Sequence, residues 1–303
     1  MRKIDKITIF TPTYNRANLL KRVFFSLKNQ TNNNFIWLII DDGSIDNTHL
    51  IVNEFIKTSS FEIKYIYQEN GGKYRAHNTA VKNCETKYFL ILDSDDYLTS
   101  DAIDILYKKI KEIENEDKIS GIIGNRIDEM TKKPIGKEIP NIKIASGNEL
   151  YQKYNFVGDT LRLYKTKILS EFLFPEILNE NFISENVVFD KIDKKYKMLV
   201  IKEKIYIGEY QEKGYSNNIY KVHRNNPKGY LLTLNSAAKY AITLKKKISF
   251  TILYIIWRKK MKVSPKDIKE IENLGILEYV LYPVALLFIF FKYPKFFFKN
   301  FID

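Results

Sequence analysis

The chain has 303 residues and a formal net charge of +13, with 49 Lys and Arg against 36 Asp and Glu. This length suffices for one large domain, or for one domain with a helical extension. The single cysteine, Cys84, excludes an internal disulfide and a cysteine-based zinc site, and the three histidines are too widely spaced for a metal-ligand pattern. The N-terminal residues lead into only a short apolar run, so we expect no secretory signal and a cytoplasmic location.

The first third of the chain alternates between strand patterns and helix patterns. Short apolar runs typical of buried strands occupy residues 7–10, 35–40, 63–67 and 88–92. Apolar side chains recur at helical spacing over residues 19–27, 50–56 and from about 100 to 113. This alternation predicts an α/β fold with a mostly parallel sheet, in which ligands bind beyond the carboxyl ends of the strands.

Polar clusters follow three of these predicted strands, at residues 11–16, 41–44 and 93–96. Because the carboxyl ends of parallel strands lie at one edge of a sheet, we expect the three clusters to meet there. The last cluster holds three carboxylates, Asp93, Asp95 and Asp96, directly after an apolar run. Carboxylates repel one another unless a cation lies among them, and hard oxygen ligands suit Mg²⁺ or Mn²⁺. The alternative is a solvated turn that precedes the next helix.

Four motifs in register resemble a known family. They are Thr-Pro-Thr-Tyr-Asn-Arg at residues 11–16, Asp-Asp-Gly-Ser at 41–44, Asn-Gly-Gly-Lys at 70–73 followed by Asn78, and Asp-Ser-Asp-Asp at 93–96. In this order and spacing the chain resembles a family 2 nucleotide-sugar glycosyltransferase of the GT-A (Rossmann-like) fold. The resemblance covers roughly residues 5–215 and implies a central sheet flanked by helices, to which the residues beyond 218 would add a C-terminal helical extension.

The resemblance also implies roles for single residues on the donor side. The nucleotide base would contact Pro12, Thr13, Tyr14 and Asp42. Further contacts to the donor would come from Lys73, His77 and Asn78, although Lys73 could equally be a surface lysine and His77 a packed helix residue. Asp93 would contact the ribose or the metal, Asp95 would bind Mn²⁺ or Mg²⁺ at the donor diphosphate, and Asp96 could share either task.

On the acceptor side, residues 182–192 resemble the acidic motif with which the family begins a helix. Glu185 matches the carboxylate expected to act as general base on the acceptor hydroxyl. Asn186 departs from the commoner Asp, which leaves the role of a second carboxylate in doubt. Without the resemblance, Glu185 would simply favour the positive end of a helix dipole. Asp159 is a candidate for the acceptor pocket or a turn residue, and residues 210–217 match a loop that closes over the donor.

Beyond about residue 220 the resemblance fades and the chain becomes basic and aromatic. Residues 239–264 contain eight Lys or Arg and no acid, and residues 276–291 are nearly all apolar. Neither this run nor the one at 248–257 reaches the roughly 20 apolar residues of a spanning helix. Aromatic rings beside lysines are typical of a helix lying on a membrane surface. The alternative is a helical subdomain that packs on the enzyme or on a second copy, as in a homo-oligomer; nucleic acid fits the aromatic clusters poorly.

The sequence therefore predicts a catalytic domain at residues 1–218 and a helical region at 219–303. The expected activity is an inverting, metal-dependent transfer of a sugar from a nucleoside diphosphate, by default UDP, to a saccharide or lipid-linked acceptor. Synthesis of a bacterial surface polysaccharide at the inner face of the cell membrane would fit the tail. A nucleotidyltransferase would need a glycine-rich loop at residues 11–16, and an Asp-x-Asp phosphatase would place its aspartates after the first strand. A non-catalytic GT-A-like binding or scaffold protein is the remaining alternative.

Overall fold

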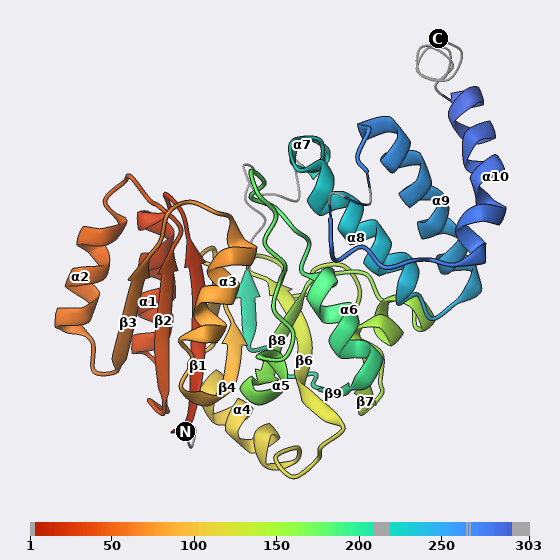
Figure 1. Cartoon of the computed structure of the whole chain (residues 1–303). Coiled ribbons are helices and arrows are strands. Elements are labelled where there is room, and N and C mark those ends of the chain that lie inside the picture. The colour runs from red at the N-terminus through yellow and green to blue at the C-terminus, as the bar shows by residue number, and fades with distance from the viewer. Residues whose placement is uncertain (1–3, 209–218, 265, 267, 293–303) are drawn as a thin grey trace.

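The computed structural model describes residues 4–208, 219–264, 266 and 268–292. A curled sheet has helices on both faces, and a group of C-terminal helices lies beside it (Figure 1). The first half of the sheet is parallel, in the order β3-β2-β1-β4. Its strands are β1 (Ile4–Thr13), β2 (Phe35–Asp41), β3 (Glu62–Tyr67) and β4 (Thr86–Ile91). The helices between and after these strands are α1 (Ala17–Lys28), α2 (Thr48–Thr58), α3 (Lys73–Lys82) and α4 (Ala102–Lys111).

The second half of the sheet is mixed rather than parallel. Strand β8 (Thr160–Lys165) is antiparallel to both β4 and β6 (Ile119–Asp128). Parallel to β6 run β9 (Lys197–Val200) and β10 (Tyr206–Gly208). The short strands β5 (Asp96–Leu98) and β7 (Ile144–Ala145) are antiparallel to β10 and β9. The helical segments here are η1 (Glu149–Lys153), α5 (Thr166–Leu169) and α6 (Asn186–Lys195).

Alternate residues of the central strands fill two cores on opposite faces of the sheet. In β2, Trp37 and Ile39 pack with α1, α2 and α4, whereas Leu38 and Ile40 pack with α3 and α6. All residues of β2 are buried, which explains why its sequence is apolar without interruption over residues 35–40. The helices pack on these faces through the apolar stripes that their periodicity predicted, such as Leu20, Val23 and Leu27 of α1.

The C-terminal helices form a third core of their own. They are α7 (Ile219–Asn225), α8 (Pro227–Lys239), α9 (Leu244–Met261) and α10 (Ile276–Lys292). Leu231, Tyr254 and Ile289 lie in this core, whereas Leu232 of α8 packs into the core that α6 shares with the sheet. Within the described residues no helix combines the length and the apolar character that crossing a bilayer requires. The expected domain boundary at residue 218 falls outside the described residues and stays a prediction.

Candidate active site

A cavity of about 710 Å³ opens at the carboxyl ends of the parallel strands. Its lining includes residues from all three polar clusters, at 12–16, 42 and 93–96, as their positions after β1, β2 and β4 predicted. Six carboxylates but four cationic side chains line it, so the formal charge of the lining is −2. A divalent cation would balance this charge.

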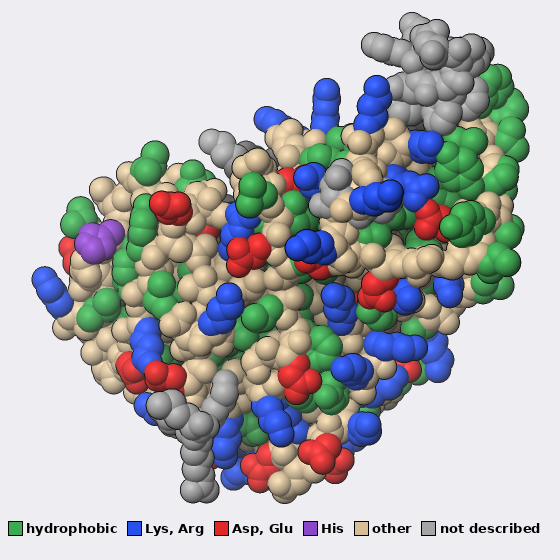
Figure 2. Space-filling view, in the orientation of Figure 1, with side chains coloured by type: hydrophobic (Ala, Val, Ile, Leu, Met, Phe, Trp, Pro, Cys, Tyr) green, Lys and Arg blue, Asp and Glu red, His purple; other side chains and the backbone are tan. Residues whose placement is uncertain are grey.

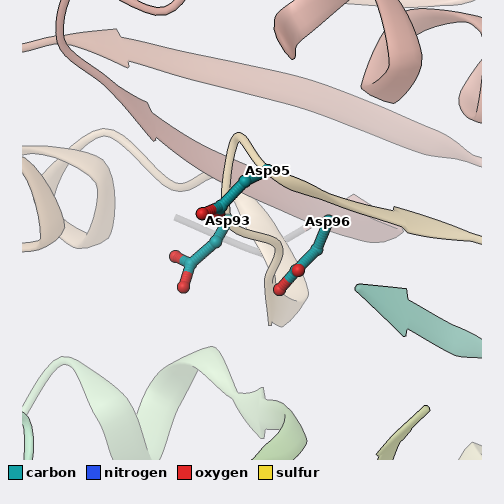
Figure 3. Close-up of side chains that lie close together, drawn as sticks. All are labelled: Asp93, Asp95 and Asp96. Carbon is teal, nitrogen blue, oxygen red and sulfur yellow. The ribbon is translucent and has the colours of Figure 1, made fainter. Parts of the chain in front are cut away.

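Three of these carboxylates lie close together after β4. One ligand atom from each of Asp93, Asp95 and Asp96 lies within 4.8 Å of the others. Figure 3 shows the side chains of Asp93 and Asp95 adjacent, with that of Asp96, the first residue of β5, set apart from them. Oxygen ligands at this spacing fit Mg²⁺ or Mn²⁺.

Asp96 differs from its two neighbours because it is 2% exposed and its carboxylate is held by two hydrogen bonds from a buried arginine. Arg126 of β6 donates to Asp96 Oδ1 from Nε at 3.0 Å and from a terminal nitrogen at 2.6 Å. Asp96 is buried, and burial raises its pKa to about 7, with Arg126 opposing the shift and Asp93 and Asp95 adding to it. Asp93 and Asp95 are therefore the better candidates for metal ligands. Arg126 was not anticipated, although an arginine in a ten-residue strand that is buried over its first nine residues signals a paired charge.

Arginines also fix the loop that carries Asp95. Arg16 lies 3.3 Å from Asp95 Oδ2 and donates to Ser94 Oγ at 3.1 Å. Arg22 of α1 donates to the carbonyl of Asp95 from the other side. The loop is thus held in place from the first helix of the chain.

Four side chains expected around the nucleotide base lie at one end of the cavity. Pro12 and Thr13 end β1, Tyr14 is half exposed beside them, and all three line the cavity. Thr13 Oγ1 is buried and has no hydrogen-bond partner among the described residues. Asp42 also lines the cavity, but its carboxylate accepts four hydrogen bonds from residues 68–72. In this structure Asp42 therefore shapes the 68–72 loop with all of its acceptor sites.

The helix α3 brings Lys73 between the two sides of the cavity. Its ammonium lies 2.7 Å from Asp93 Oδ1 and 2.8 Å from Glu185 Oε1. Burial lowers the pKa of Lys73, but the two carboxylates outweigh it and raise the pKa above its usual range. Lys73 is thus a cation that joins the expected metal side to the expected base, and not an isolated surface lysine.

The other two polar residues of α3 have different environments. His77 is buried against the rings of Phe10, Phe89 and Phe174, and burial lowers its pKa to about 3, so the ring is neutral. It lines the cavity, and neither ring nitrogen has a partner among the described residues. Asn78 instead exchanges two hydrogen bonds with the backbone of Phe174, at 2.8 and 2.9 Å, and does not line the cavity. Asn78 thus lies apart from the other residues expected to bind the donor.

Glu185 is the N-cap residue of α6, and both it and Asn186 line the cavity. Its side chain is 42% exposed, so a substrate hydroxyl can reach it. Ser184 contributes a weak cap at 3.4 Å from the amide of Asn186. Asp159 lines the same cavity and receives a 2.9 Å hydrogen bond from Arg126. The expected donor loop at 210–217 lies outside the described residues.

Comparison with known proteins identifies relatives of this chain. Its sequence matches the model of the family described as glycosyl transferase family 2 over residues 8–173. The glycosyltransferase GlyA of Streptococcus pneumoniae is 27% identical over 291 residues, which cover 92% of this chain and 36% of GlyA. The teichoic acid poly(glycerol phosphate) polymerase of Staphylococcus epidermidis is 31% identical over 146 residues, 48% of this chain and 19% of that protein. The chain thus spans little more than a third of the first relative and about a fifth of the second.

Solved structures share the fold at low sequence identity. TarS 1-349 of S. aureus, in complex with UDP-GlcNAc, has a TM-score of 0.60 at 17% identity over 92% of both chains. A mannosyltransferase from Pyrobaculum calidifontis, in complex with GDP-Man and Mn²⁺, has a TM-score of 0.56 at 15% identity, over 97% of this chain and 84% of that one. These neighbours confirm the expected GT-A fold.

Proposed function

The chain belongs to glycosyl transferase family 2, and from this premise we propose that it transfers a sugar, with inversion, from a UDP-sugar to an acceptor hydroxyl, with Glu185 as general base. It is a glycosyltransferase by family; the donor nucleotide, the stereochemistry and the residue roles are the proposal. The observation that carries it is Lys73, whose ammonium contacts both Asp93 and Glu185. The carboxylate suited to the donor and the one suited to the acceptor thus lie on facing sides of one cavity.

The proposed reaction is a single displacement at the anomeric carbon. The acceptor oxygen attacks this carbon and gives its proton to a carboxylate oxygen of Glu185, while the bond between the carbon and the diphosphate oxygen breaks and its electron pair leaves with UDP. Lys73 can donate to a phosphate oxygen from its place between the two carboxylates. A divalent cation, held by Asp93 and Asp95, would neutralise charge on the departing diphosphate.

The acceptor belongs to the proposal as well. A relative is named for teichoic acid synthesis, and a solved neighbour was captured with UDP-GlcNAc. These names support a saccharide or lipid-linked acceptor in the synthesis of a bacterial surface polysaccharide.

Features of the C-terminal helices support the proposal that the enzyme acts at a membrane surface. Apolar side chains of α10 are exposed along one face, among them Ile276, Val280, Leu287 and Phe291. Figure 2 shows a hydrophobic patch at the edge of the molecule where α10 lies, with lysines and arginines beside it. Apolar side chains next to basic ones match the acyl boundary and the phosphates of an anionic lipid surface. These features support our proposal that the enzyme acts at the inner face of the cell membrane.

Calorimetric titration tests the donor side of the proposal. UDP should bind in Mn²⁺ and lose affinity in excess chelator, with GDP and CDP as comparators. Asp95→Asn should weaken this binding, since it removes a charged oxygen ligand. Glu185→Gln should keep UDP binding but slow UDP release from a UDP-sugar, with water or sugar as acceptor, by about 100-fold or more.

A different result would favour the non-catalytic alternative. If the folded protein bound none of the three nucleotides in Mn²⁺, a scaffold protein with this fold would be the better conclusion. If UDP bound but Glu185→Gln released it as fast as the parent chain, another residue would have to be the base.

A further inference from the structure

The segment between α5 and α6 ends at Glu185 and contains neither helix nor strand. Its position therefore depends on contacts with its neighbours. On one side these come from α3, where Tyr74 donates to the carbonyl of Glu180 at 3.0 Å and Arg75 donates to that of Ile177 at 2.6 Å. The approach is so close that a Cβ at Gly72 would lie 1.7 Å from the carbonyl oxygen of Asn181.

The other side of this segment is held by the junction between α7 and α8. Asn226 Oδ1 accepts hydrogen bonds from the amides of Asn181, at 2.8 Å, and Phe182, at 3.1 Å. Its Nδ2 donates to the carbonyl of Val222 at 2.8 Å, and the residue is 4% exposed. One buried side chain thus satisfies two amides of the segment and fixes them to α7.

The contact is reciprocal at the first turn of α8. The Glu180 carboxylate accepts from the amides of Lys228, at 2.9 Å, and Gly229, at 2.7 Å. These are amides that a helix N-terminus leaves without an internal partner. Gly229 also packs tightly on the segment, because a Cβ there would lie 2.2 Å from the carbonyl oxygen of Phe182.

We propose that Asn226 is a positioning residue for Glu185, and that the start of the C-terminal helical region is a working part of the catalytic unit. The inference rests on the proposed role of Glu185 as base. Asn226 fixes residues 181 and 182, which lie four and three positions before Glu185, and the segment has no strand pairing of its own to keep the carboxylate in place. A displacement of this carboxylate by about 1 Å would cost on the order of 100-fold in rate.

Asn226→Ala tests this, and Asn235→Ala is the matched control. Asn235 of α8 is equally buried, donates to the carbonyl of Glu272 at 2.8 Å and accepts from its amide at 3.0 Å, away from the cavity. Asn226→Ala should lower kcat for UDP release by about 10- to 100-fold, with KM for the UDP-sugar and UDP affinity in Mn²⁺ unchanged. Asn235→Ala should lower Tm but leave kcat within about twofold. Asn226→Asp keeps the oxygen that accepts from Asn181 and Phe182 but loses the donor to Val222, so it should recover part of the rate.

The outcomes separate this inference from the proposed function. The positioning role of Asn226 would be overturned if Asn226→Ala kept the kcat of the parent chain, or if Asn235→Ala lost as much kcat as Asn226→Ala. In either case a slow Glu185→Gln variant would still support Glu185 as the general base. If Glu185→Gln were as fast as the parent chain, the proposed function itself would fail. If Asn226→Ala does not fold, Glu180→Gln tests the same contact. It should also lower kcat, because the amide NH₂ of Gln would face one of the two backbone amides of α8 that Glu180 now accepts from. A kcat equal to that of the parent chain would contradict the proposal.

Discussion

At the scale of single residues, the buried carboxyl group of Asp190 on α6 makes stability depend on pH. Burial raises its pKa from 3.8 to about 7, with repulsion from Asp193 adding to the shift, and Ser236, Asn148 and Arg162 opposing it. Between about pH 4 and pH 7 the folded chain therefore holds a proton that the unfolded chain has released. The free energy of unfolding should fall as the pH rises through this window, by at most about 1.4 kcal/mol per pH unit from this group.

Asp190→Asn should flatten this dependence, because an amide does not titrate. Urea unfolding at pH 5 and at pH 7 measures the difference. Asp104→Asn is the control, since hydrogen bonds from Thr31 and Asn32 lower the pKa of that carboxyl and its effect appears only at acid pH. Equal slopes in the parent chain and in Asp190→Asn would contradict the assignment.

The sequence predicted which motif residues line the cavity better than it predicted the hydrogen-bond partners of their side chains. The polar clusters that follow β1, β2 and β4 line one cavity as expected, because the carboxyl ends of adjacent parallel strands lie at one edge of a sheet. The ion pair between Arg126 and Asp96 could not be predicted from the sequence. Arg126 lies on β6 and Asp96 begins β5, and the sheet joins these two strands through β10, which pairs with both. The four partners of Asp42 likewise follow from the path of a loop and not from a motif.

At the scale of elements, the junction of the 70–72 turn with α3 depends on a glycine. Gly72 has φ +91°, which other residues adopt with strain, and faces the carbonyl oxygen of Asn181. Gly72→Ala should lower the free energy of unfolding by about 3 kcal/mol or more, since strain and steric overlap add. Gly275→Ala is the control, because Gly275 has φ +71° but nothing within 4 Å of an added Cβ, and should cost about 1 kcal/mol.

Urea denaturation of the two variants separates these effects. Equal losses in the free energy of unfolding would mean that only the backbone angle matters, and that the segment before α6 moves to accommodate the added methyl group. A larger loss in Gly72→Ala would support a rigid contact between α3 and Asn181.

Strands and helices with long apolar patterns were predictable, and short ones were not. The runs at 35–40 and 88–92 correspond to β2 and β4, because a strand buried on both faces is apolar throughout. Strands β5, β7 and β10 have two or three residues each and form only because their partners are already in place. The periodicity of apolar residues therefore could not predict the mixed strand directions in the second half of the sheet.

At the scale of the whole molecule, the exposed face of α10 predicts binding to anionic vesicles. The full chain should float with phosphatidylglycerol-containing vesicles, less so in high salt, and poorly with phosphatidylcholine alone. Replacing Val280 and Leu287 by Asp should reduce binding by about tenfold or more, because each loses apolar burial and adds a like charge to the lipid. Ile45→Asp, which changes an even more exposed apolar residue after β2, is the control.

Flotation measures this directly, beside the oligomeric state of the same samples. If the parent chain and the Val280 and Leu287 variant float equally, α10 does not bind lipid. Loss of a dimer in that variant, without any flotation by the parent chain, would assign the face to a second copy instead.

The contact between the catalytic segment and α8 also decides how parts of this enzyme could be exchanged. Glu180 and Asn226 lie far apart in the chain, yet each supplies what the backbone of the other's segment lacks. A chimaera that takes residues 170–185 from a relative would thus need the turn between α7 and α8 from the same parent. The smallest transplantable module for acceptor choice is two separate pieces of sequence.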